Sequence, residues 1–466
     1  MKNAVKSFKS AALNTPVEAR TENGMKALES SLSANVDLFF KIGASRGKDI
    51  TVAFEKAYQE DAETAIRIAL WARDARSGAG ERQIFRDILK HLNTYHANDV
   101  TFNLLAKVPE LGRWDDLLEL PIEQSLPLIK KGLSEKNGLC AKWMPRKGPI
   151  AVGLRKQLGL TPKAYRKLLV SLTNVVETAM CSKNWDSIDF NKVPSLAMAR
   201  YNKTFYKNAL ESYTQYKAKL VKGEAKINAA AVYPYDIVKT IKAGGDKVVA
   251  DEQWKALPNY MTDANVLPMV DVSGSMMAGL PSNPNIQILD IAVSLGLYCA
   301  DKNLGSFKDL FLTFSENSEM VHLKGTLSQK ITQMETSRWG MNTNLHKAFE
   351  LILKIAKNND VPQEQMPSAL LILSDMQFDQ CVDFDDSAFY MMKRKYESAG
   401  YKMPGIVFWN LRDAGNTPVK FDEKGTALVS GFSPAIMKSV LGADYANMTP
   451  ENIMKQTVFI DRYNFK

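Results

Sequence analysis

Cysteine and histidine are both scarce in this chain, with four of each among 466 residues. The cysteines lie far apart and include no C-x-x-C pair, which argues against a disulfide framework and against a cysteine-based zinc site. We therefore expect reduced thiols and a cytoplasmic protein; the four are Cys140, Cys181, Cys299 and Cys381. The histidines are too scattered to predict a histidine-based metal centre; they are His91, His96, His322 and His346.

Long apolar runs are missing as well. The sequence has no stretch of 18 or more apolar residues, so we expect no membrane span. The first nine residues are basic but lack an apolar centre, which argues against a secretory signal. We expect residues 1–24 to form an N-terminal arm.

Charge is distributed unevenly along the chain. Residues 1–250 hold 40 Lys and Arg against 26 Asp and Glu, whereas residues 251–466 hold 20 against 25. Within the first part, residues 141–250 alone hold 20 basic against 7 acidic residues. A basic region joined to a mildly acidic one indicates a polyanionic partner for the basic region.

Residues 25–245 are predicted to form a helical module. Apolar residues recur at helical spacing in 62–72, and the stripe is wide enough that we expect this helix to be buried on more than one side. The pairing of helices through short turns favours an α-solenoid. A linker between this module and the second domain is expected at 242–247, where Gly244 and Gly245 lie. Further helices are expected at 101–108, 122–132, 162–180, 194–219 and 234–242.

The pattern changes at residue 262, and 262–466 is predicted to be a second domain. Apolar strands alternate here with helices, which is typical of a doubly wound α/β (Rossmann-like) sheet. The strands are expected at 264–270, 308–314, 369–374, 404–410 and 456–460. The helices are expected at 286–302, 343–357, 386–398 and 433–441.

Oxygen-bearing side chains follow two of these strands. Asp271, Ser273 and Ser275 occupy alternate positions after the first strand, Thr343 lies in a polar loop, and Asp375 follows another strand. Because ligands bind at the carboxyl ends of strands in open α/β sheets, we expect these side chains to meet. Oxygen donors suit a hard divalent cation, Mg2+ or else Mn2+ or Ca2+. Asp-x-Ser-x-Ser alone also fits a helix cap or a turn.

These residues resemble the metal-ion-dependent adhesion site (MIDAS) of a von Willebrand factor A domain. The resemblance implies that Ser273, Ser275 and Thr343 bind the ion directly or nearly so, and that Asp271 and Asp375 act largely through water. It also implies that a protein partner supplies an Asp or Glu to the open position on the metal.

Four segments of the helical half resemble a second family. They are residues 72–82, 111–117, 142–146 and 193–198. They resemble a helical module of plant and bacterial proteins of unknown function that carry an A domain behind it. That arrangement is similar to the TROVE module of the Ro autoantigen. The resemblance implies a ring of HEAT-like repeats, closed by the A domain, that binds small structured RNAs and the ends of misfolded RNAs.

The basic side chains of the helical half are candidates for RNA contacts, since Lys and Arg neutralise phosphates. Trp114, Trp143 and Tyr165 lie among them and are candidates for base stacking. Two other interpretations stay open: the aromatic residues belong to the core, and the charges around 73–82 form an internal ion-pair network. The candidates are Arg73, Arg76, Arg82, Arg113, Lys142, Arg146, Lys147, Arg155, Lys156 and Arg166.

The function expected from the sequence is a non-enzymatic RNA-binding scaffold, part of a ribonucleoprotein, whose A domain recruits a protein partner through a metal. The alternative is a metal-dependent protein-interaction or assembly protein, including a virion-associated one, with no nucleic-acid role. An enzyme is disfavoured, because no Walker loop and no Ser–His or Cys–His order accompanies the expected metal.

Overall fold

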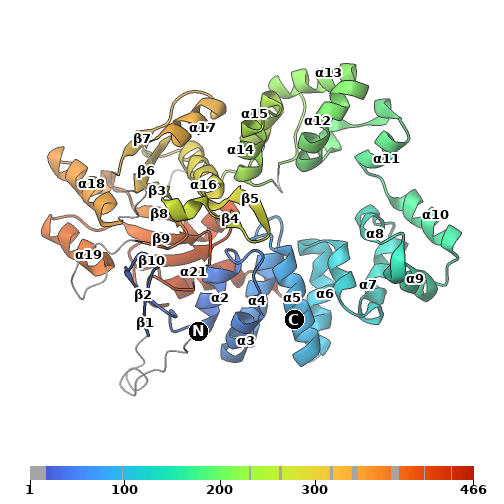
Figure 1. The fold of residues 1–466 in the computed structure, drawn as a ribbon, viewed down its shortest axis with the longest axis horizontal. Helices are drawn as coiled ribbons and strands as arrows, with labels where there is room; N and C mark the ends of the chain where they lie inside the picture. The colour runs from blue at the N-terminus through green and yellow to red at the C-terminus, as the bar shows by residue number, and fades with distance from the viewer. Residues whose placement is uncertain are drawn as a thin grey trace.

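The computed structural model describes residues 17–96, 98–229, 232–261, 265–314, 318–337, 345–378, 388–413, 415–441 and 443–465. An N-terminal region of helices is followed by a mixed six-stranded sheet with its own helices (Figure 1). The chain is therefore α in its first half and α/β in its second half.

The helices of the first half follow a curved path that starts and ends at the sheet (Figure 1). The path begins where α2 packs on strand β10 and returns where α14 packs on α16. Its helices are α2 (Ala34–Ile42), α3 (Thr51–Glu60), α4 (Ala62–Arg73), α5 (Arg82–Tyr95), α6 (Asn98–Leu111), α7 (Ile122–Ser134), α8 (Gly138–Trp143), α9 (Gly148–Gln157), α10 (Pro162–Leu172), α11 (Val176–Cys181), α12 (Ser195–Asn208), α13 (Leu210–Val221), α14 (Pro234–Lys242) and α15 (Lys247–Ala256).

Helix α4 shows why this half folds as it does. The Asp61 carboxylate caps its first turn by accepting hydrogen bonds from the N–H groups of Glu63 and Thr64. Every residue from Thr64 to Arg73 is buried, which confirms the prediction that this helix is covered on more than one side. A helix enclosed in this way lies between neighbours, and α4 packs against α2, α3, α5 and α6.

The sheet has the strand order β10-β9-β8-β3-β6-β7, in which all pairs are parallel except β6–β7. Its strands are β3 (Val266–Asp271), β6 (Leu310–Phe314), β7 (Met320–His322), β8 (Ala369–Ser374), β9 (Gly405–Asn410) and β10 (Thr426–Ser430). Strands β3, β8, β9 and β10 are buried at every position, as expected for parallel strands covered on both faces. The helices of this half are α16 (Ile288–Lys302), α17 (Leu327–Thr336), α18 (Leu345–Asn358), α19 (Ala388–Ser398), α20 (Met437–Val440) and α21 (Pro450–Val458).

The last strand of the sheet was predicted in the wrong place. Residues 456–460 are not a strand, because Thr449 caps a helix that Pro450 begins and that runs to Val458. The outermost parallel strand is instead β10, which pairs with β9. The prediction of a linker at 242–247 is also wrong. Gly244, with φ of +70°, ends α14 in a tight turn that leads directly into α15.

The two halves interlock rather than follow one another as separate bodies. Helix α2 lies against β10, where the Ser430 hydroxyl donates to the carbonyl of Phe39 at 2.7 Å. The Asn410 side chain donates to the carbonyl of Phe40 at 3.1 Å. From the other end of the chain, α21 packs on both β10 and α4. One continuous apolar core runs through both halves. The hairpin of β1 (Glu18–Arg20) and β2 (Lys26–Leu28) also joins the sheet half, by pairing Leu28 with Thr417.

We expect Gly43→Ala to lower the free energy of unfolding by about 2 kcal/mol, because an added methyl overpacks the interface between α2 and the end of β10. A Cβ at residue 43 would lie 2.7 Å from the backbone of Gly431, which cannot turn aside as a side chain does. Urea unfolding would measure the decrease. Gly153→Ala is the matched control, since a Cβ there meets nothing within 4 Å and alanine favours the interior of α9. Equal midpoints for the two variants would contradict the close packing at Gly43.

Candidate functional site

The central site lies where two neighbouring parallel strands end. Strands β3 and β8 pair in register from Val266 with Ala369 to Val270 with Leu373. Asp271 ends β3 and Asp375 follows β8, so both carboxylates lie at the same edge of the sheet. The chain leaves β3 toward β6 on one side, and β8 lies on the other, which makes this the switch point of the topology.

A backbone N–H group and a hydroxyl group hold Asp271 in place. The Asp271 carboxylate accepts the Ser273 N–H at 2.9 Å through Oδ1 and the Ser374 hydroxyl at 2.5 Å through Oδ2. The hydroxyl oxygens of Ser273 and Ser275 lie 3.1 Å apart. The structure therefore brings Asp271, Ser273, Ser275 and Asp375 into one cluster. Thr343, the fifth predicted ligand, lies outside the described residues.

Ser374 belongs to this site and was missed from the sequence. It occupies the last position of an apolar strand, directly before Asp375, and only the pairing of β8 with β3 shows that its hydroxyl reaches Asp271. The signal that was available is a hydroxyl residue directly before the strand-ending aspartate.

The two carboxylates are buried close together, and this sets their electrostatics. Burial, together with the charge of Asp375, raises the pKa of Asp271 to about 7. Burial also raises the pKa of Asp375, although the Ser275 hydroxyl and the Arg412 guanidinium act in the opposite direction. Among the described residues, the buried Oδ2 atom of Asp375 has no hydrogen-bond partner, and Nη1 of Arg412 lies 3.7 Å from it.

This arrangement fits a hard divalent cation. The donors are carboxylate and hydroxyl oxygens, which such ions prefer. A positive ion beside Asp271 and Asp375 would satisfy the orphaned Oδ2 and stabilise the charged forms that burial disfavours. The backbone next to the cluster is strained, since Met376 has φ of +63°.

The N-terminal segment borders this cluster. The Thr21 hydroxyl donates to the Phe378 carbonyl at 2.6 Å, and the Glu22 N–H donates to Oε1 of Gln377 at 2.5 Å. The Glu22 carboxylate is near enough for its charge to raise the pKa of Asp375. The described part of the predicted arm is thus docked beside the two aspartates.

The basic residues of the α4–α5 turn mostly serve the fold. The prediction that Arg73 contacts RNA is wrong, because this side chain is buried and its Nε donates to Asp116 Oδ2 at 2.7 Å. Arg113 is paired with Asp115 and lies 3.6 Å above the Trp143 ring. The alternative of an internal ion-pair network is confirmed here, since Glu81 pairs with Arg46 and Asp74 with Arg462.

The aromatic candidates are largely core residues. Trp114 and Tyr165 are buried, and the Tyr165 hydroxyl donates to the Pro145 carbonyl at 3.0 Å. Base stacking on either ring is therefore excluded in this conformation. Trp143 is half-buried, and Arg113 covers one of its faces.

The remaining basic candidates lie on α8, α9, α10 and their connections. Residues 136–176 contain nine Lys and Arg and no Asp or Glu. The nine cations are Lys136, Lys142, Arg146, Lys147, Arg155, Lys156, Lys163, Arg166 and Lys167. Most of them are exposed. The structure describes every residue of 136–176, and none of these nine side chains forms an ion pair with a described residue. We call residues 136–176 the basic segment. Arg82 is also exposed, and burial together with the charges of Arg113 and Arg86 lowers its pKa.

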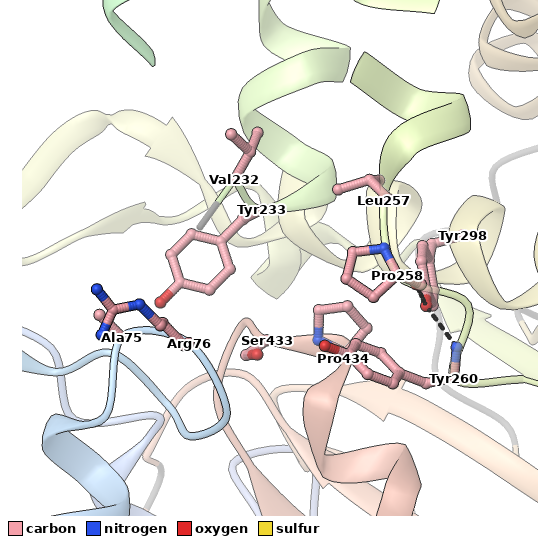
Figure 2. Close-up of a pocket in the computed structure, with 10 residues that line it drawn as sticks. All are labelled: Ala75, Arg76, Val232, Tyr233, Leu257, Pro258, Tyr260, Tyr298, Ser433 and Pro434. Atoms are coloured by element: carbon pink, nitrogen blue, oxygen red, sulfur yellow. Dashed lines mark hydrogen bonds between the residues drawn. The ribbon is translucent and has the colours of Figure 1, made fainter. Parts of the chain in front are cut away.

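Arg76 lies elsewhere, at a small pocket between the two halves. The pocket is formed by the α4–α5 turn, the ends of α14 and α15, and the segment before α20, with Tyr233, Tyr260 and Pro434 among its walls (Figure 2). The Tyr298 hydroxyl donates to the Pro258 carbonyl at 2.5 Å and accepts the Tyr260 N–H at 3.0 Å. Among the described residues that line the pocket, Arg76 is the one that carries a charge.

None of the described helices combines the length and the apolar composition needed to cross a membrane.

Two family models divide the chain as the fold does, near residue 266. A domain of unknown function, DUF2828, matches residues 21–122 and 155–267, and another, DUF7788, matches residues 265–461. The crystal structure of the Deinococcus radiodurans Ro (RSR) protein is similar, with a TM-score of 0.49 and 13% identity over 92% of this chain and 99% of that one. The uncharacterized protein L728 of Acanthamoeba polyphaga mimivirus is 32% identical over 495 residues, which cover 92% of this chain and 85% of the relative. This chain therefore belongs to the family of the mimivirus protein L728.

Proposed function

We propose that the protein is a non-enzymatic cytoplasmic scaffold that binds structured or misfolded RNA through its helical half. The observation that carries this proposal is the basic segment, in which nine cations occur without one acidic residue. Cations paired with carboxylates stabilise a fold, whereas exposed cations without acidic partners repel one another. A polyanion that neutralises them and releases its counterions removes that repulsion.

The surface of the basic segment also supports RNA over an anionic small molecule. Its cations are spread over three helices and their connections, which suits an extended phosphate backbone. Exposed apolar side chains lie among them, at Leu139, Ile150, Val152 and Val170. Unpaired bases expose apolar faces that such side chains can contact. In a closed duplex the bases are stacked inside and the surface is formed by phosphates.

Salt-dependent RNA binding by the full chain, freed of co-purifying nucleic acid, tests the proposal. If six to ten phosphates are contacted, we expect the affinity for a structured RNA to fall about 10³-fold or more between 50 and 200 mM salt. No measurable binding at 50 mM salt would refute it. The alternative, an acidic protein partner for the basic segment, predicts instead a complex from cells that survives nuclease treatment.

We further propose that the sheet half is a von Willebrand A-type domain whose MIDAS-type cluster binds Mg2+, or Mn2+ or Ca2+, together with an acidic side chain of a protein partner. Asp271, Ser273, Ser275 and Asp375 would hold the ion, with Thr343 as a further ligand. The support is the orphaned oxygen of Asp375 beside a second buried carboxylate. The ion would supply a positive centre for the partner's carboxylate, and Arg412 stabilises the charge of Asp375.

Ser273→Ala tests the metal site without dismantling the sheet. We expect Mg2+ affinity to fall at least about tenfold, because a hydroxyl donor is removed. In metal-free buffer we expect the Tm to change by no more than about 3 °C, since the variant loses the hydroxyl's interactions with Ser275 and Asp271 but keeps the N–H bond to Asp271. Calorimetric titration would measure the Mg2+ affinity, and thermal melts in chelator would measure the Tm. Ser398→Ala, an exposed serine at the end of α19, is the control. Unchanged Mg2+ affinity, or a large decrease of Tm in chelator, would contradict a ligand role.

A further inference from the structure

A cluster of metal-ligating side chains lies in the helical half, apart from the site at the sheet. Glu55 extends from α3, His91 from the last turns of α5, and His96 follows α5 directly. Oε2 of Glu55 lies 2.7 Å from Nε2 of His91 and 2.8 Å from Nε2 of His96. All three donor atoms lie within 4.8 Å of one another. Two of the four histidines of the chain thus direct the same ring nitrogen to one point.

The surroundings hold these three side chains in position. Gln59, one turn after Glu55 on α3, donates to Glu55 Oε1 at 3.0 Å and leaves Oε2 directed at the imidazoles. The His96 ring packs on Tyr58 with centroids 4.1 Å apart, and the His91 ring packs on Tyr95 at 4.9 Å. A hydrogen-bonded carboxylate is a usual feature of a metal ligand set, and the ring contacts restrict rotation of the two imidazoles.

We propose that Glu55, His91 and His96 bind a divalent ion of the zinc class. Two imidazole nitrogens and one carboxylate oxygen are a donor set that Zn2+ accepts, and three protein ligands leave a fourth position open. Solvent reaches the cluster, because the side chains of His91 and His96 are 16% exposed and that of Glu55 is 29% exposed. A bound ion would also cross-link α3 and α5. Without the ion, Glu55 contributes to this helix pair through its hydrogen bonds to His91 and His96.

The charge of the cluster suits this role. A glutamate carboxylate is ordinarily ionised at neutral pH, so Glu55 brings one negative charge to the cluster. The site is chemically distinct from the oxygen-only cluster at Asp271, because nitrogen donors select Zn2+ over Mg2+. It stands independently of the proposed function.

Zinc titration of the full chain in excess Mg2+ tests the proposal, since Mg2+ occupies the oxygen-only site. Competition against a fluorescent zinc chelator should give one Zn2+ per chain for the native protein. The double variant His91→Ala, His96→Ala should bind it at least about 100-fold more weakly. His322→Ala, an exposed histidine on β7, is the matched control and should bind as the native protein does.

Three further outcomes make the test decisive. Glu55→Gln keeps the shape of the cluster but removes its charge, and it should weaken zinc binding at least about tenfold while its melting in chelator stays native. Added zinc should raise the Tm of the native chain and leave that of the double variant unchanged. Equal zinc uptake by native protein and double variant, or native binding weaker than about 10 μM, would overturn the proposal and leave a hydrogen-bonded Glu–His–His cluster.

Discussion

Replacing Lys147, Lys156, Lys163 and Lys167 together with glutamine is expected to weaken binding of a structured RNA about 10²-fold or more at 100 mM salt. These four side chains are exposed and take part in no described hydrogen bond or ion pair, so the fold does not depend on them. Each lysine–phosphate interaction that the variant cannot form should also make the dependence of log affinity on log salt shallower by about 0.7 to 0.9. Removing four such interactions therefore predicts a slope shallower by about 3. Fluorescence-anisotropy titrations at several salt concentrations would measure both effects.

A control variant loses the same net charge from the sheet half. It distinguishes the loss of direct contacts at the basic segment from the loss of general electrostatic attraction to RNA. Lys354, Lys357, Lys402 and Lys424 are exposed, and their joint replacement with glutamine removes four charges as well. We expect this control to lower RNA affinity by less than about threefold, because long-range attraction is screened beyond about 10 Å. Equal decreases in affinity for the two quadruple variants would contradict an RNA surface on the basic segment.

The sheet edge was predictable from the sequence because its determinants are local. A buried parallel strand is a short apolar run, and an aspartate directly after it lies at the carboxyl edge of the sheet. This rule was enough to place Asp271 and Asp375 at that edge from the sequence. Ser374 could not be assigned in the same way, since its role arises from pairing with a strand 103 positions away along the chain.

Elements whose state depends on partners were harder to predict. Residues 456–460 are apolar enough for a strand, yet the cap at Thr449 commits the segment to α21, which packs on β10 and α4. From the sequence, His91 and His96 were too scattered to be grouped, because Glu55, to which both side chains are hydrogen-bonded, lies 36 positions before His91 on another helix. For the two histidines, the missing information was that α3 lies beside α5.

Charge density misled for a similar reason. Arg73 and Arg76 are three positions apart in a basic turn, and from the sequence alone they are equal candidates for a phosphate contact. The fold separates them, because Arg73 ends α4 facing the buried Asp116, whereas Arg76 lies on the exposed turn. The same type of residue thus stabilises the core at one position and is available to solvent at the other.

We expect Arg73→Met to lower the free energy of unfolding by about 3 kcal/mol, because it leaves a buried carboxylate short of a partner. Asp116 is fully buried and accepts from Arg73 Nε at 2.7 Å, from Arg86 Nε at 2.7 Å and from the Arg113 N–H at 3.0 Å. Since Arg86 and Arg113 still donate to Asp116, the decrease in unfolding free energy should lie at the low end of the range for breaking a buried ion pair. Urea unfolding followed by tryptophan fluorescence would measure it, with Trp114 close to the site of change.

Arg76→Met is the matched control, with the same substitution three positions further along the chain. Its guanidinium is exposed and donates to the Glu110 carbonyl at 2.8 Å, so we expect a change within about 0.5 kcal/mol. RNA affinity separates the two roles further. Arg73→Met should leave the salt dependence of RNA binding unchanged, because a cation that is already neutralised by Asp116 releases no counterions from RNA. A stable Arg73→Met protein with weakened RNA binding would reverse the assignment and place this arginine at the RNA surface.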